Sequence, residues 1–235
     1  MKRVGLLVAL SVFSLSNLIS QNKFTISSGV AKPLGEFAAT NYGDNSGYAK
    51  LGYSYGLQAD YVFPSKILAG LSIVAHRNEF NHEAFMSDIV TDLGFKSTEI
   101  RSTGMHSSYT ALAVGGYNII DNPAFTLDAS LGIGGSLSSM STPVGIGARS
   151  VNLFNDEIDI DYNNKYAFAY NIGTRFIYYL SSSLGLSVSV SYFATNPEYI
   201  TMKKVGSTSQ KITSSRTYIT NNSILDLTVG IVFGK

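Results

Sequence analysis

The feature that most constrains this chain is a two-residue alternation through residues 47–63, GYAKLGYSYGLQADYVF. Every second residue from Leu51 to Phe63 is aromatic or aliphatic, whereas those between them, from Gly52 to Asp60, are small or polar. The alternation predicts a β-strand, because successive side chains leave opposite faces of a pleated strand. Function depends on which of the two rows faces the interior of the fold.

The same alternation recurs along the sequence and predicts an all-β chain. The eight expected strands are 22–31, 47–63, 67–78, 106–120, 125–134, 165–178, 184–192 and 225–233. Two of them are irregular, since Leu68 and Val74 interrupt the third and Leu112 and Val114 interrupt the fourth. The facing of these two strands is therefore left open by the pattern.

The connections between the expected strands fall into two kinds. Residues 64–66, 121–124 and 181–183 are tight turns, whereas the segments 32–47, 79–105, 138–163 and 194–217 are long and polar. Alternating short and long connections are typical of outer-membrane barrels, which have short periplasmic turns and long external loops. Loops over ~12–15 residues are uncommon in compact soluble domains. The sequence thus predicts an eight-stranded antiparallel up-and-down transmembrane β-barrel.

The size of the lumen decides which row faces lipid. An eight-stranded barrel is only just wide enough inside for side chains to fill it. Rows of Tyr, Phe, Leu and Ile would overfill that space, whereas Gly, Ser, Ala and Thr would fit. Charged residues make up 14% of the chain, against roughly 25% in soluble domains. We therefore expect the aromatic rows to face lipid; the alternative is a soluble lipocalin-like barrel.

The N-terminus has the form of a signal peptide over residues 1–20. Lys2 and Arg3 precede an apolar run from Val4 to Phe13, and a Ser-rich stretch follows. This order predicts export, with cleavage after Ser20 or, alternatively, near residues 14–16. The apolar run is shorter than the ~20 residues of a membrane-spanning helix. Residues 21–235 would then form the outer-membrane barrel domain.

Cysteine and charge exclude several function classes. The chain has no cysteine, which rules out disulfides, thiolate metal sites and cysteine nucleophiles. Its formal net charge of +1 gives no electrostatic case for a nucleic-acid partner.

Both ends of the mature chain resemble a known family. GVAKPLGEFA at 29–38, followed by residues 47–63, resembles the first hairpin of the small OmpA/OmpX-like outer-membrane barrels of Gram-negative bacteria. The last strand, LDLTVGIVFGK, is similar to the signal that the barrel-assembly machinery reads, although Gly234 and Lys235 follow the aromatic Phe233. The resemblance implies an outer-membrane location, periplasmic termini, contact with outer-membrane lipid, and no shared enzymatic activity or cofactor.

Four isolated charges interrupt the small-residue rows. They are Asp60, Asp128, Arg175 and Asp226. Counted from the strand ends, all four are expected at a similar depth in the periplasmic half of the lumen. Asp128 and Arg175 stand on neighbouring strands, and we expect them to pair, because a buried charge without a partner is costly. The set is interpreted as a structural polar network; the alternative is a conductive or proton path.

The histidines gather near the outer ends of the third and fourth strands. His76, His82 and His106, with Glu79, match no established metal-site spacing, so no metal is predicted. His106 and Ser108 share one face of a strand, as a base and a nucleophile would, but no acidic partner can be assigned to them.

Two external loops carry opposite charge. The acidic loop holds Asp156, Glu157, Asp159 and Asp161, and imitates the start of a calcium loop before the match fails at Asn164 and Tyr170. It is interpreted as a solvated loop, with loose divalent-ion binding as the alternative. The basic loop holds Lys203, Lys204, Lys211 and Arg216. It is interpreted as a solvated Ser/Thr-rich loop, with contact to lipopolysaccharide phosphates or to the acidic loop as the alternative.

The function expected from the sequence is non-enzymatic. A monomeric barrel would serve membrane structure, adhesion or interaction with an extracellular ligand through its long external loops. The alternatives are a narrow porin-like diffusion channel and, after it, a lipid A-modifying barrel enzyme.

Overall fold

The computed structural model of the chain describes residues 22–40, 46–84, 87, 98–99, 104–141, 146–149, 155–161, 165–205, 212–219 and 221–234. Its barrel strands are β1 (Asn22–Leu34), β2 (Ala49–Val62), β3 (Ile67–Phe80), β5 (Met105–Asp121), β6 (Phe125–Ser141), β9 (Lys165–Tyr179), β10 (Leu184–Thr195) and β13 (Asn222–Phe233). Five further strands are β4 (Thr98–Glu99), β7 (Ile146–Arg149), β8 (Asn155–Asp161), β11 (Glu198–Val205) and β12 (Ile212–Ile219). A short helix, α2 (Gly35–Ala38), follows β1. Within these ranges no helix is long and apolar enough to cross a membrane.

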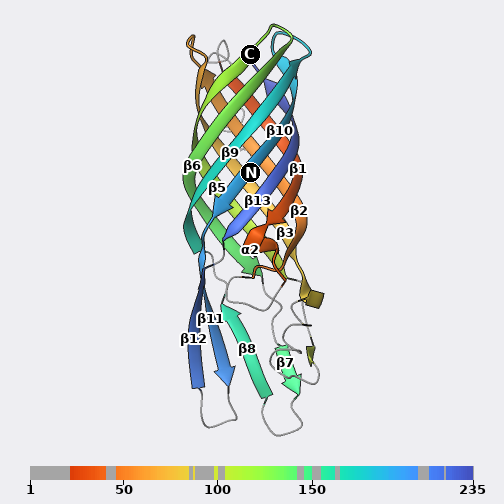
Figure 1. Cartoon of the computed structure of the whole chain (residues 1–235), viewed down its shortest axis with the longest axis vertical. Coiled ribbons are helices and arrows are strands. Elements are labelled where there is room, and N and C mark those ends of the chain that lie inside the picture. Colours follow the sequence, from red (N-terminus) through yellow and green to blue (C-terminus); the bar gives the residue numbers. More distant parts are fainter. Residues whose placement is uncertain are drawn as a thin grey trace, which may run out of the picture.

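The eight barrel strands close into one sheet in the order β1-β13-β10-β9-β6-β5-β3-β2. Every neighbouring pair is antiparallel, and each strand lies beside the barrel strands that precede and follow it in the chain. The first and last strands complete the closure, with Phe24 opposite Phe233. The predicted eight-stranded up-and-down barrel is confirmed, and Figure 1 shows its tilted strands.

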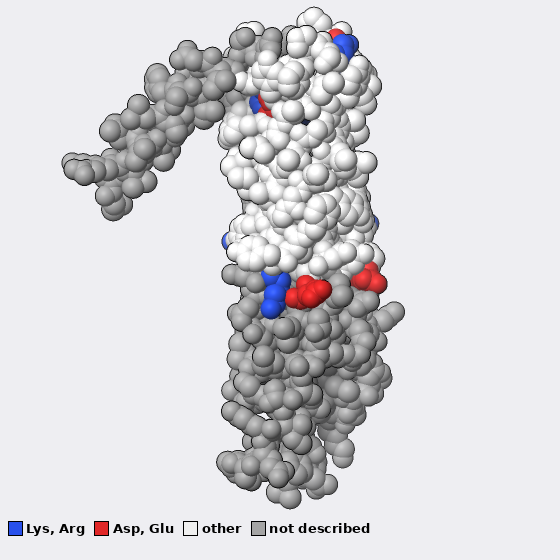
Figure 2. Space-filling model, turned by 90° about the vertical axis from the view of Figure 1, so that its left-hand side faces the viewer, with Lys and Arg blue, Asp and Glu red and all other residues white. Residues whose placement is uncertain are grey.

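The aromatic rows lie on the outside of the barrel, as predicted. Tyr53 is 63% exposed and Leu57 44%, whereas Ser54 and Asp60 on the opposite face of β2 are 1% and 3% exposed. On the face drawn in Figure 2, charged side chains gather near the two ends of an otherwise uncharged wall. An apolar band around a polar-lined lumen is the pattern of a transmembrane barrel.

The facing of the two irregular strands is also settled by burial. Leu68 and Leu112 are 2% and 3% exposed, so they lie in the lumen, while Ile73 and Tyr109 on the alternate rows face outward. The interrupting apolar residues are therefore lumen residues, and the period-two pattern continues through them in both strands.

The two ends of the barrel differ. The tight turns and the end of β13 lie together at one end, and α2 lies at the other, where strands outside the barrel also extend (Figure 1). In the turn after β2, Lys66 adopts a φ of 66° and donates a backbone hydrogen bond of 2.8 Å to the Phe63 carbonyl.

The long segments between barrel strands contain more regular structure than the sequence indicated. Five strands within them form a second sheet, in the order β12-β11-β8-β7-β4. In the first such segment, β1 runs on to Leu34 and α2 follows it, so that Phe37 is buried. The sequence analysis did not predict these elements, because they are short and lie within long polar segments.

An apolar cluster occupies the lumen near the mouth beside α2. Its members are buried side chains from α2 and from six barrel strands: Ala31, Phe37, Ala49, Leu112, Ala169, Phe193 and Ile224. The expectation of a polar interior is thus correct only in part. Buried polar side chains such as His76 and Asp226 lie at the level of this cluster, and a second apolar cluster, of Ile177, Tyr179 and Val232, lies nearer the tight turns.

Candidate functional site in the barrel lumen

Arg175 of β9 is the centre of a buried charge cluster near the tight turns. Its Nη2 lies 2.6 Å from Asp60 Oδ2 of β2 and 2.9 Å from Asp128 Oδ2 of β6, and its Nη1 donates to Thr25 at 3.1 Å. Asp128 and Arg175 are direct cross-strand partners in the β6–β9 register. The pairing expected from adjacent strands is therefore present, with Asp60 as a second carboxylate.

Lys23 is a member of this cluster that the sequence interpretation missed. Its ammonium lies 3.4 Å from Asp128 Oδ1 and is 2% exposed. Lys23 alternates with the outward-facing Phe24 and Ile26, so the period-two pattern of β1 by itself predicts a lumen position for it. The cluster then holds two cations and two carboxylates, which balances its formal charge in a place where an unpaired charge is costly.

Asp226 does not belong to this cluster, so the prediction of a common depth is wrong for it. Along β1, the strand partner of Asp226 is Ala31, whereas the partner of Asp60 is Lys23. Eight residues separate these two partners, which is about 26 Å along the strand. Counting from the strand ends neglected the shear between tilted strands, which offsets residues at equal distance from their ends.

Asp226 instead binds His76, and His76 binds Ser108. His76 Nε2 donates to Asp226 Oδ2 at 2.8 Å, and Nδ1 lies 3.3 Å from Ser108 Oγ. All three side chains are buried. The order Ser–His–Asp is that of a hydrolase triad, but the cavity beside Ser108 measures about 10 Å³. Such a space holds about one water molecule and no acyl substrate.

The other two histidines have separate partners. His106 donates from Nε2 to the Gly47 carbonyl at 2.8 Å, and its ring packs edge-on against Phe37 at 5.0 Å. His82 lies beyond the end of β3, where its Nε2 accepts the Gly104 N–H at 2.7 Å. The expected histidine group at the strand ends is therefore divided, with His76 and His106 inside the lumen. The described part of the chain contains no set of three His, Cys, Asp or Glu placed to hold a metal.

The acidic and basic loops meet in the second sheet. The β8–β11 register places Glu157 opposite Lys204 and Ile158 opposite Lys203. Only the backbone of this region is described. The side chains of the divalent-ion alternative, Asp156, Glu157, Asp159 and Asp161, therefore lie outside the described part of the chain. Lys211 and the predicted signal peptide, residues 1–20, lie outside it as well.

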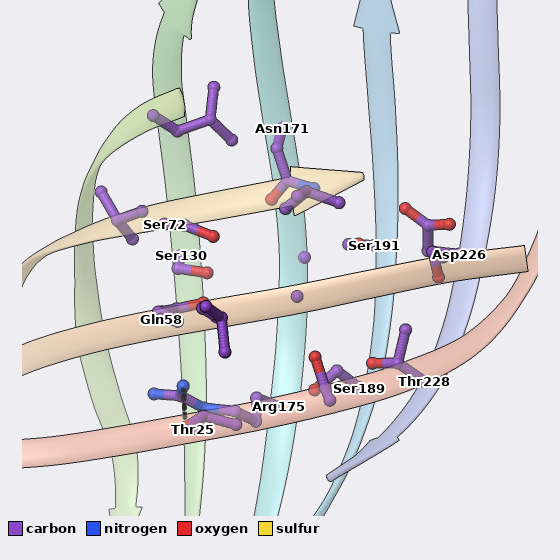
Figure 3. A pocket seen from close by; sticks show the side chains of 18 of the residues that line it. Thr25, Gln58, Ser72, Ser130, Asn171, Arg175, Ser189, Ser191, Asp226 and Thr228 are labelled. Carbon is purple, nitrogen blue, oxygen red and sulfur yellow. Dashed lines mark hydrogen bonds between the residues drawn. The ribbon is translucent and has the colours of Figure 1, made fainter. Parts of the chain in front are cut away.

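A polar cavity of about 80 Å³ lies in the lumen between the Arg175 cluster and the apolar cluster. Arg175 borders it on one side, and Leu112 and Val114 from the apolar end of the lumen line it as well. Most of the remaining lining is hydroxyl and amide side chains, several of which are labelled in Figure 3. The cavity is large enough for several water molecules.

Comparison with known proteins identifies the fold. No family model and no curated sequence matches the chain. It is similar to the structure of a major outer membrane protein from Thermus thermophilus, at 14% identity, covering 90% of this chain and 98% of that one, with a TM-score of 0.50. The outer membrane protein OprG from Pseudomonas aeruginosa is similar at 13% identity, covering 92% and 98%, with a TM-score of 0.50.

The chain has the fold of the small outer-membrane β-barrels. The predicted resemblance is confirmed at this level. At such low identity the likeness shows the fold alone, so any more specific role has to be argued from this chain's own residues.

Proposed function

We propose that this protein is a non-enzymatic, non-conducting barrel of the outer membrane that presents its second sheet to partners outside the cell. The observation that carries the proposal is the packing of the lumen. Phe37, Phe193 and Leu112 fill it near one mouth, and the Arg175 cluster fills it near the other. A solute would have to displace both in turn.

The second sheet supports an external role. In barrels of this kind the tight turns face the periplasm and the long connections face outward. The five strands outside the barrel come from those long connections, at the end opposite the tight turns (Figure 1). The β8–β11 ladder joins strands from two different long connections, so the sheet would be presented as one unit.

The membrane environment supplies the remaining partners. The exposed aromatic wall suits outer-membrane lipid, and Lys203 and Lys204 suit the phosphates of lipopolysaccharide at the rim. The alternating strand β13, with Phe233 near its end, is the segment that the barrel-assembly machinery would read. We propose a monomer, because the barrel closes on itself without an open edge.

Planar-bilayer recordings test the non-conducting barrel. The protein, shown to be folded by its gel shift, should give no unitary current steps. A Phe37→Ala/Phe193→Ala variant should give steps more often, because it thins the apolar barrier. Reproducible steps from the wild-type protein would instead make it a narrow channel.

Adhesion of a non-adherent bacterial host tests the surface role. Cells that display the wild-type barrel should adhere to immobilised extracellular-matrix proteins or to one another. Cells with residues 199–218 replaced by a short Gly/Ser turn should not, although the barrel still folds and reaches the membrane. Equal adherence of the two strains would refute the role of the second sheet.

A further inference from the structure

The lumen cavity contains two buried oxygen atoms that no protein group binds. Asp226 Oδ1 and Ser54 Oγ have no hydrogen-bond partner among the described residues, and both side chains line the cavity. Asp226 is 3% exposed and Ser54 1%. Figure 3 shows Asp226 at the edge of the cavity among Ser191, Asn171 and Thr228. Other buried polar atoms of the described residues also lack a partner, but these two belong to side chains that line this cavity.

The carboxylate is the more demanding of the two. Asp226 Oδ2 is bound by His76, but this bond satisfies only one of its two oxygen atoms. A buried carboxylate needs a positive partner as well as hydrogen bonds. Arg175 lines the same cavity, yet its guanidinium is already bound to Asp60, Asp128 and Thr25. Among the described residues, His76 balances the charge of Asp226 only when its ring is protonated. With a neutral His76, the balancing charge has to come from inside the cavity.

The chemistry of the lining indicates the class of ligand. Carboxylate, hydroxyl and amide oxygens are hard donors, which suit alkali and alkaline-earth cations rather than transition metals. A single carboxylate would neutralise only half of the charge of a divalent ion, which disfavours such an ion. The cavity, at about 80 Å³, has room for a small cation and a few waters.

We propose that the cavity binds one small monovalent cation, such as Na⁺, K⁺ or NH₄⁺, with Asp226 Oδ1 and Ser54 Oγ as its protein ligands. The bound ion neutralises Asp226 and satisfies both oxygen atoms at once. It thereby holds together strands from opposite ends of the chain, since Ser54 is on β2 and Asp226 on β13.

Unfolding in urea tests the proposal, because urea adds no cation. Protein purified from outer membranes is unfolded and refolded in micelles with NaCl, KCl, NH₄Cl or choline chloride at equal ionic strength. A ligand of the folded state multiplies the folded-to-unfolded ratio by 1 + [L]/Kd. Above the Kd, each ten-fold rise in one of the small cations should raise that ratio about ten-fold, while choline, too large for the cavity, should leave it unchanged.

Three variants locate the effect. Asp226→Asn should abolish the difference between the small cations and choline, and Ser54→Ala should require several-fold more cation for the same shift. Asp121→Asn, at an exposed carboxylate at the end of β5, should keep the wild-type dependence. If Asp226→Asn does not fold, the cation dependence of Ser54→Ala tests the proposal on its own.

Two results would overturn the proposal. One is equal stability of the wild-type protein in all four salts, as expected if a protonated His76 balances Asp226. The other is a cation dependence that survives in Ser54→Ala and Asp226→Asn without change, which would place any bound ion elsewhere.

Discussion

Replacement of Arg175 by alanine should strongly destabilise the barrel. Wild-type Arg175 binds Asp60 and Asp128 at 2.6 and 2.9 Å, while Lys23 binds Asp128 at 3.4 Å. Without the guanidinium, one cation faces two carboxylates, all three of them nearly inaccessible to water. Breaking a buried pair from one side costs about 3–5 kcal/mol.

A second argument gives the same magnitude. The variant can avoid a buried net charge by taking up one proton on a carboxylate. For an aspartate with an ordinary titration midpoint near 3.9, protonation at pH 7 costs about 4 kcal/mol. The folded variant then binds one proton more than its unfolded state, so its stability rises as pH falls. The difference in free energy of unfolding between the variant and the wild type should decrease by about 1.4 kcal/mol per pH unit from pH 7 to pH 5.

The assay is urea unfolding in lipid vesicles, followed by the gel shift of the folded barrel, at pH 7 and pH 5. Arg77→Ala is the matched control, because Arg77 is exposed on the outside of β3. It should leave the free energy of unfolding nearly unchanged, because its side chain is fully exposed. The double variant Arg175→Ala/Asp60→Asn restores the balance of one cation and one carboxylate and should recover most of the loss.

Two outcomes would refute this account of the cluster. One is an unfolding midpoint of Arg175→Ala equal to that of the wild type. The other is a double variant no more stable than the single one, because the loss would then come from packing rather than from an unpaired charge.

Three further predictions concern other parts of the barrel. Leu131→Arg, on the lipid-facing row of β6, should destabilise the barrel in vesicles by about 2–4 kcal/mol, and a cost near zero would contradict that facing. Burial, followed by the charge of Lys50, lowers the pKa of His82. The contribution of neutral His82 to the free energy of unfolding should therefore be lost as pH falls below about 6.5. An NMR titration midpoint of His82 at or above that value would contradict this. Gly29→Ala should cost about 1–3 kcal/mol in urea unfolding, because its Cβ would meet the Leu227 carbonyl. Gly115→Ala, whose Cβ meets no atom within 4 Å, should be tolerated.

The barrel itself could be predicted because its signals are local. Alternation of period two marks each strand, and the row of Tyr53 and Tyr55 is too bulky for an eight-stranded lumen. The pairing of Asp128 with Arg175 was also within reach, since the two strands are joined by one connection and are direct neighbours. Leu68 and Leu112 make the facing of their strands ambiguous in the sequence, but in the packed barrel they mark lumen positions.

The contents of the lumen were decided by the tertiary structure. His76 and Asp226 are 150 residues apart in sequence, and their bond depends on the shear of the closed barrel, which no single strand encodes. Phe37 reaches the lumen only because α2 folds back at the barrel mouth. The sequence by itself determined the wall, because the direction of each side chain follows from its own strand. The pairing of charges, the apolar cluster and the cavity arose only on closure, which sets the depth at which side chains from distant strands meet.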